Sequence, residues 1–277
     1  MTPFARQFVL LIGILALSYV AYVLVLMTQE SRLTFAGQGI PMTTDLRDEF
    51  PLANYVTLKP STGDVLACYL ESDQEFNDGP IAIVAHGNAE TIGHWSEIAK
   101  SLLQTGMSLF LVEYPGYGGS AGVPSEATIG ETFEKAYAWL EANHSLSHRK
   151  VIGLGRSLGT GPIVELAARH RIDGLVLISP FSSLSRIAWG MGAPGFLLKT
   201  RYDNVEALRP FQGPTILLHG TKDQIIPPSH SERLAKTNGR VTFQQLDAGH
   251  NDLLENADVV VDHLKTWLAE NDLWQDP

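Results

Sequence analysis

The chain has 277 residues, of which 44% are hydrophobic and 18% are charged, and its formal net charge is −10. This length is enough for one large domain with a buried core. The acidic balance, without any run of basic residues, argues against a nucleic acid or an anionic membrane surface as partner. The single cysteine, Cys68, excludes an intramolecular disulfide and a cysteine-based metal site, and its alternating apolar surroundings predict a buried side chain.

The amino-terminal segment reads FVLLIGILALSYVAYVLVLM over residues 8–27 and carries no charge. A helix of this length spans about 30 Å, which is the thickness of the bilayer hydrocarbon. A cleaved signal peptide is the alternative, but its apolar region is usually ~7–15 residues long and precedes a small-residue cleavage site. This segment is longer and has no such site, so we expect residues 1–28 to form an N-terminal transmembrane anchor.

The flanks of this segment give a weak indication of its orientation. Arg6 lies before the span, and acidic and basic residues are mixed after it. A short positive tail favours a cytoplasmic amino terminus, with the large domain on the non-cytoplasmic side. Tyr19 and Tyr22 are expected near one membrane interface.

A polar, turn-rich connector at residues 29–50 precedes a region in which strand and helix patterns alternate. Segments 55–60 and 64–72 flank a Ser-Thr-Gly-Asp turn, which predicts a β-hairpin. The later strands are nearly continuous apolar runs, typical of a mostly parallel sheet with helices on both faces. These strands are expected at 80–87, 108–114, 150–155, 173–180, 214–220 and 241–247, with helices at 90–106, 124–144, 162–170, 229–239 and 258–271. We therefore predict one α/β domain over residues 51–277.

One serine stands between an apolar strand and a helix, with Gly155 and Gly159 two residues to either side of Ser157. A sharp strand-to-helix turn strains the backbone of the central residue and crowds the two flanking positions, which must then be small. It presents the hydroxyl at the positive end of the following helix. The Gly-x-Ser-x-Gly pattern alone is weak evidence of function, but between an apolar strand and a helix it predicts that Ser157 is a nucleophile.

A serine hydroxyl needs a base, and an imidazole needs an acid to orient it. Asp223 and His250 each follow an apolar strand, and ligands gather at the carboxyl ends of parallel strands. The chain order Ser157, Asp223, His250 is that of one known triad arrangement. We expect these three residues to be catalytic, although a turn-forming role for Asp223 and a surface role for His250 are the alternatives.

The tetrahedral intermediate of acyl transfer requires backbone donors. The N–H of Leu158, at the start of the helix, is one candidate. The second candidate is the N–H of Asn88, in the loop after the strand at 80–87, where Gly87 would allow a close approach to substrate. We expect His86 to pack this loop.

These motifs together resemble the α/β-hydrolase superfamily, over about residues 52–270. They comprise the pattern at 155–159, the loop at 86–88, YPGYGGSAG at 114–122, HGTKDQIIP at 219–227 and AGHND at 248–252. The branch that the chain resembles is the membrane-anchored serine hydrolases with a small lid. The resemblance implies hydrolysis of esters or thioesters, with lipids or acylated proteins as substrates.

Two departures from that family are visible. Glu113 stands where relatives often carry Asp, and we interpret it as a structural acid beneath the site. The cysteine-rich amino terminus of eukaryotic protein depalmitoylases is absent, which argues against a cytosolic, lipidated depalmitoylase.

The longest irregular insertion, at residues 181–213, is rich in large apolar side chains and occupies the usual lid position of this family. It is either a cover for an apolar acyl pocket or a helix pair that closes the core. Trp189 within it, and Tyr117 in the glycine-rich loop, are predicted to contact substrate.

Two other functions remain open: a peptidase of the same fold, and a non-catalytic membrane-tethered binding protein. No cofactor is expected, and no metal, because His144 and His148 have no acidic partner nearby. We also expect that a protein lacking residues 1–28 would be soluble and active.

Overall fold

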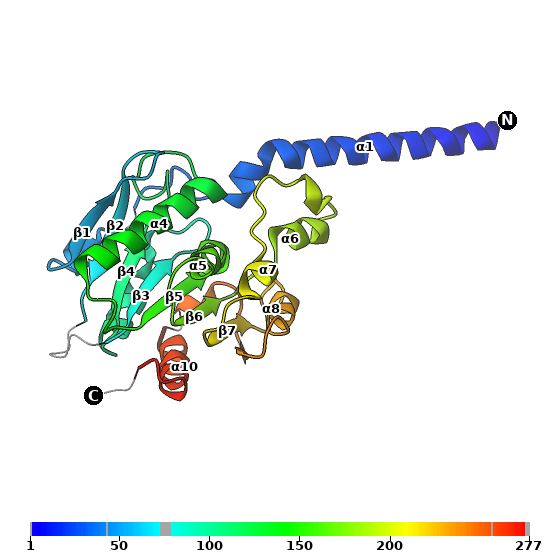
Figure 1. Cartoon of the computed structure of the whole chain (residues 1–277). Helices are drawn as coiled ribbons and strands as arrows, with labels where there is room; N and C mark the ends of the chain where they lie inside the picture. Colours follow the sequence, from blue (N-terminus) through cyan, green and yellow to red (C-terminus); the bar gives the residue numbers. More distant parts are fainter. Residues whose placement is uncertain (1, 43, 73–78, 256, 275–277) are drawn as a thin grey trace.

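The computed structural model describes residues 2–42, 44–72, 79–255 and 257–274. These residues form an α/β domain around one sheet, from which the first helix projects (Figure 1). The strand order across the sheet is β1-β2-β4-β3-β5-β6-β7-β8. The strands are β1 Asn54–Leu58, β2 Val65–Leu70, β3 Ile81–Ala85, β4 Ser108–Val112, β5 Val151–Arg156, β6 Gly174–Ile178, β7 Thr215–Gly220 and β8 Val241–Leu246.

The sheet is antiparallel at one edge and parallel elsewhere. β1 and β2 form the predicted hairpin, and β2 also pairs antiparallel with β4. From β4 onward all neighbouring strands are parallel, so their carboxyl ends share one rim. The predicted mostly parallel sheet is therefore confirmed, with each strand at its predicted place.

Helices cover both faces, and the strands divide their side chains between two cores. In β3, Ile81, Ile83 and Ala85 belong to one core, and Ala82 and Val84 belong to the other, as the two-residue period of a strand requires. The first core packs under α4 Glu126–Asn143, α5 Thr160–Ala167, α7 Asn204–Leu208 and α8 Ser229–Leu234. The second packs under α3 Ser96–Leu103 and α10 Ala257–Glu270. The remaining short helices are α2 Leu46–Glu49, η1 Ile92–Trp95, η2 Ser157–Gly159, α6 Leu184–Gly190, η3 Gly195–Leu197 and α9 Asp252–Glu255.

Side-chain hydrogen bonds set two helix ends that differ from the predicted ones. Ser125 caps α4 together with Thr128, whereas Glu131 accepts a hydrogen bond from the Ser61 N–H in the hairpin turn. Helix α8 ends at Leu234, short of the predicted residue 239, because the Thr237 hydroxyl donates to the Leu234 carbonyl (2.6 Å).

The first helix, α1, runs over Pro3–Thr34 and is longer than the predicted anchor. Thr2 caps it, and it continues into the segment that the sequence assigned to a polar connector. Only Val23 and Glu30 of this helix are buried, and most of its apolar side chains face outward. By length and composition it is able to cross a membrane. The division into anchor, connector and domain stays a prediction, although its boundaries do not coincide with this helix.

Candidate active site

Ser157 lies at the turn between β5 and α5 in the strained conformation that the sequence predicts. Its φ is +49°, a left-handed value that a residue with a side chain seldom adopts. A Cβ at Gly155 would lie 2.7 Å from the Gly159 carbonyl oxygen, and one at Gly159 would overlap the Ala85 carbonyl. Both flanking positions therefore require glycine, and the turn places the Ser157 hydroxyl above the carboxyl rim of the sheet.

The rim brings together the three side chains that were predicted from separate strand ends. His250 Nε2 is 3.1 Å from Ser157 Oγ, and His250 Nδ1 is 2.6 Å from Asp223 Oδ2. Because Nδ1–H donates to the carboxylate, Nε2 is left as an acceptor for the serine hydroxyl. The Asp223 side chain is fully buried and the His250 side chain is nearly so. These contacts give the geometry of a nucleophile, a base and an orienting acid.

Several donors hold the Asp223 carboxylate. Its Oδ1 accepts from the backbone N–H groups of Ile225 (2.9 Å) and Ile226 (2.8 Å), and its Oδ2 lies 3.2 Å from His219 Nε2. Burial alone would raise the pKa of Asp223, but the hydrogen bonds from His219, His250 and Ile226 outweigh it and hold the pKa well below its usual range. Asp223 is therefore an anion throughout the neutral pH range.

His219 is a supporting residue that the sequence interpretation missed. Its Nδ1 lies 2.7 Å from Ser231 Oγ, and its Nε2 lies 2.7 Å from the Ile226 carbonyl oxygen. Since Nε2 faces two oxygen acceptors, the proton sits on Nε2 and the ring donates toward Asp223. His219 lies at the end of β7, four residues before Asp223, and this position in the sequence could have indicated its supporting role.

A buried pair supports the loop after β3 from below. His86 Nε2 lies 2.6 Å from Glu113 Oε1, and both side chains are inaccessible to solvent. Glu113 also accepts from the backbone N–H groups of Ile92 and Tyr114. These contacts fit the structural role assigned to Glu113 and the packing role assigned to His86.

A second buried pair, Arg156 with Glu90, joins this loop to the histidine loop and was not foreseen. Arg156 forms an ion pair with Glu90 and donates through Nη2 to the His250 carbonyl (3.1 Å) and to Asn251 Oδ1 (2.9 Å). Burial lowers the pKa of Arg156 to about 10 although the Asp223 carboxylate raises it, so the guanidinium remains a cation at neutral pH. Arg156, which lies within the Gly-x-Ser-x-Gly pattern at 155–159, therefore links the loop after β3 to the loop that carries His250.

Gly87 has a different role from the one predicted. Its N–H donates to Glu90 Oε2 (2.8 Å), and a Cβ there would lie 2.7 Å from Glu90 Oε1 and 2.8 Å from Arg156 Nη1. It is also absent from the described residues that line the cavity beside Ser157. Glycine is required at this position to admit the buried ion pair, and substrate approach does not explain it.

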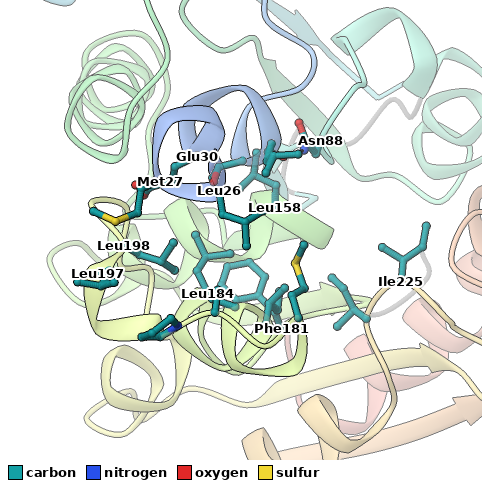
Figure 2. Close-up of a pocket in the computed structure, with 18 of the residues that line it drawn as sticks. Leu26, Met27, Glu30, Asn88, Leu158, Phe181, Leu184, Leu197, Leu198 and Ile225 are labelled. Atoms are coloured by element: carbon teal, nitrogen blue, oxygen red, sulfur yellow. The ribbon is translucent and has the colours of Figure 1, made fainter. Parts of the chain in front are cut away.

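An apolar cavity of about 260 Å³ opens beside Ser157 (Figure 2). Its described lining comes from the end of α1, the two candidate oxyanion residues, the first half of the 181–213 insertion and the loop after β7. The residues are Val23, Leu26, Met27, Glu30, Leu33, Thr34, Asn88, Ser157, Leu158, Phe181, Leu184, Ile187, Ala188, Met191, Ala193, Pro194, Leu197, Leu198, Ile225 and Ile226. Asn88 and Leu158 thus face the same space as the Ser157 hydroxyl.

The insertion at 181–213 was expected either to cover a pocket or to close the core, and it has one part in each position. Residues 181–198, with α6 and η3, line the cavity as a cover would. Farther on, Tyr202 and Leu208 are buried in the first core, and Asn204 donates to the Phe181 carbonyl (2.9 Å). The first part borders the cavity and the second closes the core.

Two aromatic residues predicted to contact substrate lie outside the described cavity lining. Tyr117 is fully buried: its hydroxyl accepts from the Gly37 N–H and donates to Asn88 Oδ1 (both 3.2 Å). Trp189 is 56% exposed and its ring lies against Phe196. Tyr117 therefore supports the Asn88 loop from behind, and Trp189 faces solvent because the inner side of α6 is formed by other residues.

Comparisons with known proteins identify the family of this chain. A family model described as alpha/beta hydrolase fold matches residues 80–209. The alpha/beta hydrolase domain-containing protein 17B of Xenopus laevis is 30% identical over 191 residues, which cover 68% of this chain and 66% of that protein. An uncharacterised protein of Mycobacterium tuberculosis is 28% identical and covers 94% of both chains. The chain belongs to the α/β-hydrolase superfamily.

Solved structures show the same fold at low sequence identity. An esterase of Pyrococcus furiosus superposes with a TM-score of 0.67 at 15% identity, over 83% of this chain and 97% of the esterase. A thermophilic esterase of Thermogutta terrifontis gives a TM-score of 0.61 at 19% identity, over 79% and 99% of the two chains. The family and these relatives together support a hydrolase activity.

Proposed function

We propose that the protein is a serine hydrolase that cleaves carboxylic ester or thioester bonds, with Ser157 as nucleophile, His250 as base and Asp223 as orienting acid. The observation that carries the proposal is the chain of contacts from Ser157 Oγ through the His250 ring to a buried carboxylate. A serine alcohol is activated when such a base takes its proton.

In the first half-reaction, His250 Nε2 takes the Ser157 proton while Oγ attacks the carbonyl carbon of the substrate. The oxyanion is stabilised by the backbone N–H groups of Leu158 and Asn88, at the rim of the apolar cavity. His250 then gives the proton to the departing alcohol or thiol, which leaves an acyl-serine. In the second half-reaction, water loses a proton to His250 and attacks the acyl carbon, and Ser157 is regenerated as the acid departs.

The cavity favours an acyl group over a peptide with a free amino terminus. Its described lining is almost wholly apolar, and the Glu30 carboxylate within it already accepts from the backbone N–H groups of Lys199 (2.8 Å) and Thr200 (2.9 Å). A peptidase that trims amino termini needs an acidic group available to the substrate. The bonded state of Glu30 supports the ester or thioester proposal over the peptidase alternative.

The nucleophile is tested with a fluorophosphonate probe on the full chain. The wild-type protein and the surface control Ser147→Ala should be labelled, and Ser157→Ala should not be. Labelling that persists in Ser157→Ala would show that another residue reacts, and wild-type protein that is never labelled would contradict a serine mechanism.

We further propose that α1 anchors the protein in a membrane, with the domain on the non-cytoplasmic side. The exposed apolar surface and length of α1 support anchoring, and the position of Arg6 before the apolar run supports the orientation. In cells, the protein should remain with membranes after alkaline extraction, and protease should reach the domain only from the non-cytoplasmic side. Release by alkali would contradict the anchor, and cleavage from the cytoplasmic side would contradict the orientation.

A further inference from the structure

The end of α1 borders the cavity that contains Ser157, although Ser157 lies far along the chain. Leu26, Met27 and Glu30 project from the last turns of this helix into the cavity (Figure 2). Asn88, a candidate oxyanion residue, donates through Nδ2 to the Leu33 carbonyl (3.1 Å). The end of α1 is therefore hydrogen-bonded to a candidate oxyanion residue and lines the same cavity as Ser157.

Hydrogen bonds fix α1 to the insertion that forms the opposite wall. The Tyr22 hydroxyl donates to the Met191 carbonyl (2.7 Å), and the Tyr19 hydroxyl donates to the Gly192 carbonyl (3.1 Å). Glu30, also in the cavity lining, accepts through Oε1 from the Lys199 and Thr200 N–H groups. These contacts hold α1 and residues 191–200 as two sides of one opening.

The surface around this opening is apolar. Trp189, Met191 and Phe196 are 56%, 52% and 68% exposed, and they lie on the insertion that α1 contacts. The charge-free run of α1 extends to Met27, whereas its cavity-lining part begins at Val23. The run that is long enough to span a bilayer thus overlaps the cavity wall over residues 23–27.

We propose that the last turns of α1 are part of the acyl-binding site, and that the bilayer delivers the substrate. This inference rests on the proposed function. With the apolar run of α1 in the hydrocarbon, the cavity opens at the membrane boundary, beside the exposed apolar side chains of the insertion. A long aliphatic acyl chain passes from lipid into the cavity without exposure to water. The substrate class is a long-chain acyl ester or thioester held in the membrane, and residues 23–34 contribute to chain-length selection.

The test compares two tryptophan substitutions in the full chain, reconstituted in phosphatidylcholine vesicles. Leu26 lines the cavity, whereas Leu24 is 55% exposed on the outer side of the same helix. Leu26→Trp should lower the ratio of kcat/KM for a palmitoyl ester to kcat/KM for an acetyl ester, both measured in the vesicles, by about tenfold or more. Leu24→Trp should change neither substrate by more than about twofold. Equal effects of the two substitutions on the palmitoyl ester would overturn the inference.

A second variant and two substrate arms complete the experiment. Leu26→Ala enlarges the cavity and should move the chain-length optimum toward longer or bulkier acyl groups, and an unchanged profile would contradict the inference. One arm offers a glycerolipid ester and the other a palmitoyl thioester on a vesicle-bound peptide, so that the faster arm identifies the source of the chain. If wild-type protein cleaves no acyl substrate, acetyl esters included, the proposed function fails. If it cleaves acetyl esters but shows no dependence on residue 26, only the present inference fails.

Discussion

The catalytic rim and the wall of the apolar cavity are built in different ways. The rim consists of polar side chains at the ends of sheet strands, and contacts of 2.6 and 3.1 Å fix Ser157, His250 and Asp223. The cavity wall is apolar and comes mainly from α1 and residues 181–198, which lie outside the sheet. Under the proposed function, the sheet positions the reacting side chains, and the added segments select the acyl group that reaches them. Changes to the rim should alter rate for every substrate, whereas changes to the wall should alter selectivity.

The largest effect is expected from the base. His250→Ala should lower the turnover of acetyl and palmitoyl esters alike, by on the order of 10³-fold or more, because the Ser157 hydroxyl loses its proton acceptor. The ratio of the two rates should stay as in the wild-type protein. Steady-state kinetics with both esters measures this, and a loss of only a few-fold would eliminate His250 as the base.

The next largest effect is expected from the buried Arg156–Glu90 ion pair, on folding stability. Arg156→Met leaves the Glu90 carboxylate buried without its cation and should cost about 3–5 kcal/mol of folding stability. The double variant Arg156→Met/Glu90→Gln should be less destabilised than the single variant, because the unpaired charge is gone. Urea unfolding of the vesicle-free, detergent-solubilised chain gives these values. A single variant as stable as the wild-type protein would show that the pair does not hold the two loops together.

A change in the wall should affect selectivity more than rate. Glu30→Leu removes the acceptor for the Lys199 and Thr200 N–H groups, so residues 191–200 should lose their fixed position against α1. The preference for palmitoyl over acetyl esters should fall by about fivefold, and Glu30→Gln, which keeps an acceptor oxygen, should restore part of it. A loss of acetyl turnover equal to the loss of palmitoyl turnover would mean that Glu30 serves the rim instead.

The smallest effect concerns stability alone, at a site on α5 away from the rim. Burial and the neighbouring Glu126 carboxylate raise the pKa of Glu165 to about 7, against the lowering effect of Arg169. The folded state therefore binds a proton more tightly than the unfolded chain, and stability falls as pH rises from the ordinary glutamate value toward and through 7. Glu165→Gln should raise Tm by a few degrees at about pH 8.5 and change it little at about pH 5. Thermal unfolding at both pH values measures this, and a lower Tm at the alkaline pH would show that the charge is stabilising.

The rim was largely predictable from the sequence because local rules determine it. The turn at Ser157 requires glycine two residues to either side, and parallel strands bring Asp223 and His250 to one edge wherever they stand in the chain. No comparable local rule predicts the pairing of Arg156 with Glu90. From sequence alone, an arginine within the 155–159 pattern is expected to be solvated, because its buried partner Glu90 is identified only when the packing of the two loops is known.

The contribution of α1 to the cavity wall was not predicted, because apolar patterns do not specify their partner. The run ending at Met27 reads the same whether its side chains face lipid or a cavity, and its contacts with Met191 and Gly192 are to backbone carbonyls, which leave no sequence signal. Aromatic residues were favoured as substrate contacts, yet Tyr117 is needed to support the Asn88 loop. That a protein lacking residues 1–28 is soluble and active stays a prediction, and such a protein would lack Val23, Leu26 and Met27 of the wall.

One labelling experiment addresses rim and wall together. A fluorophosphonate with a long alkyl chain and a photoreactive group at its end is allowed to react with the full chain in vesicles, then irradiated, and the two attachment points are located by mass spectrometry. The structure predicts a phosphonyl adduct on Ser157 and a photochemical link within residues 23–34 or 181–198. An adduct on another residue, or a chain end linked only to surfaces outside these two segments, would contradict a single site built from the sheet rim, α1 and the insertion.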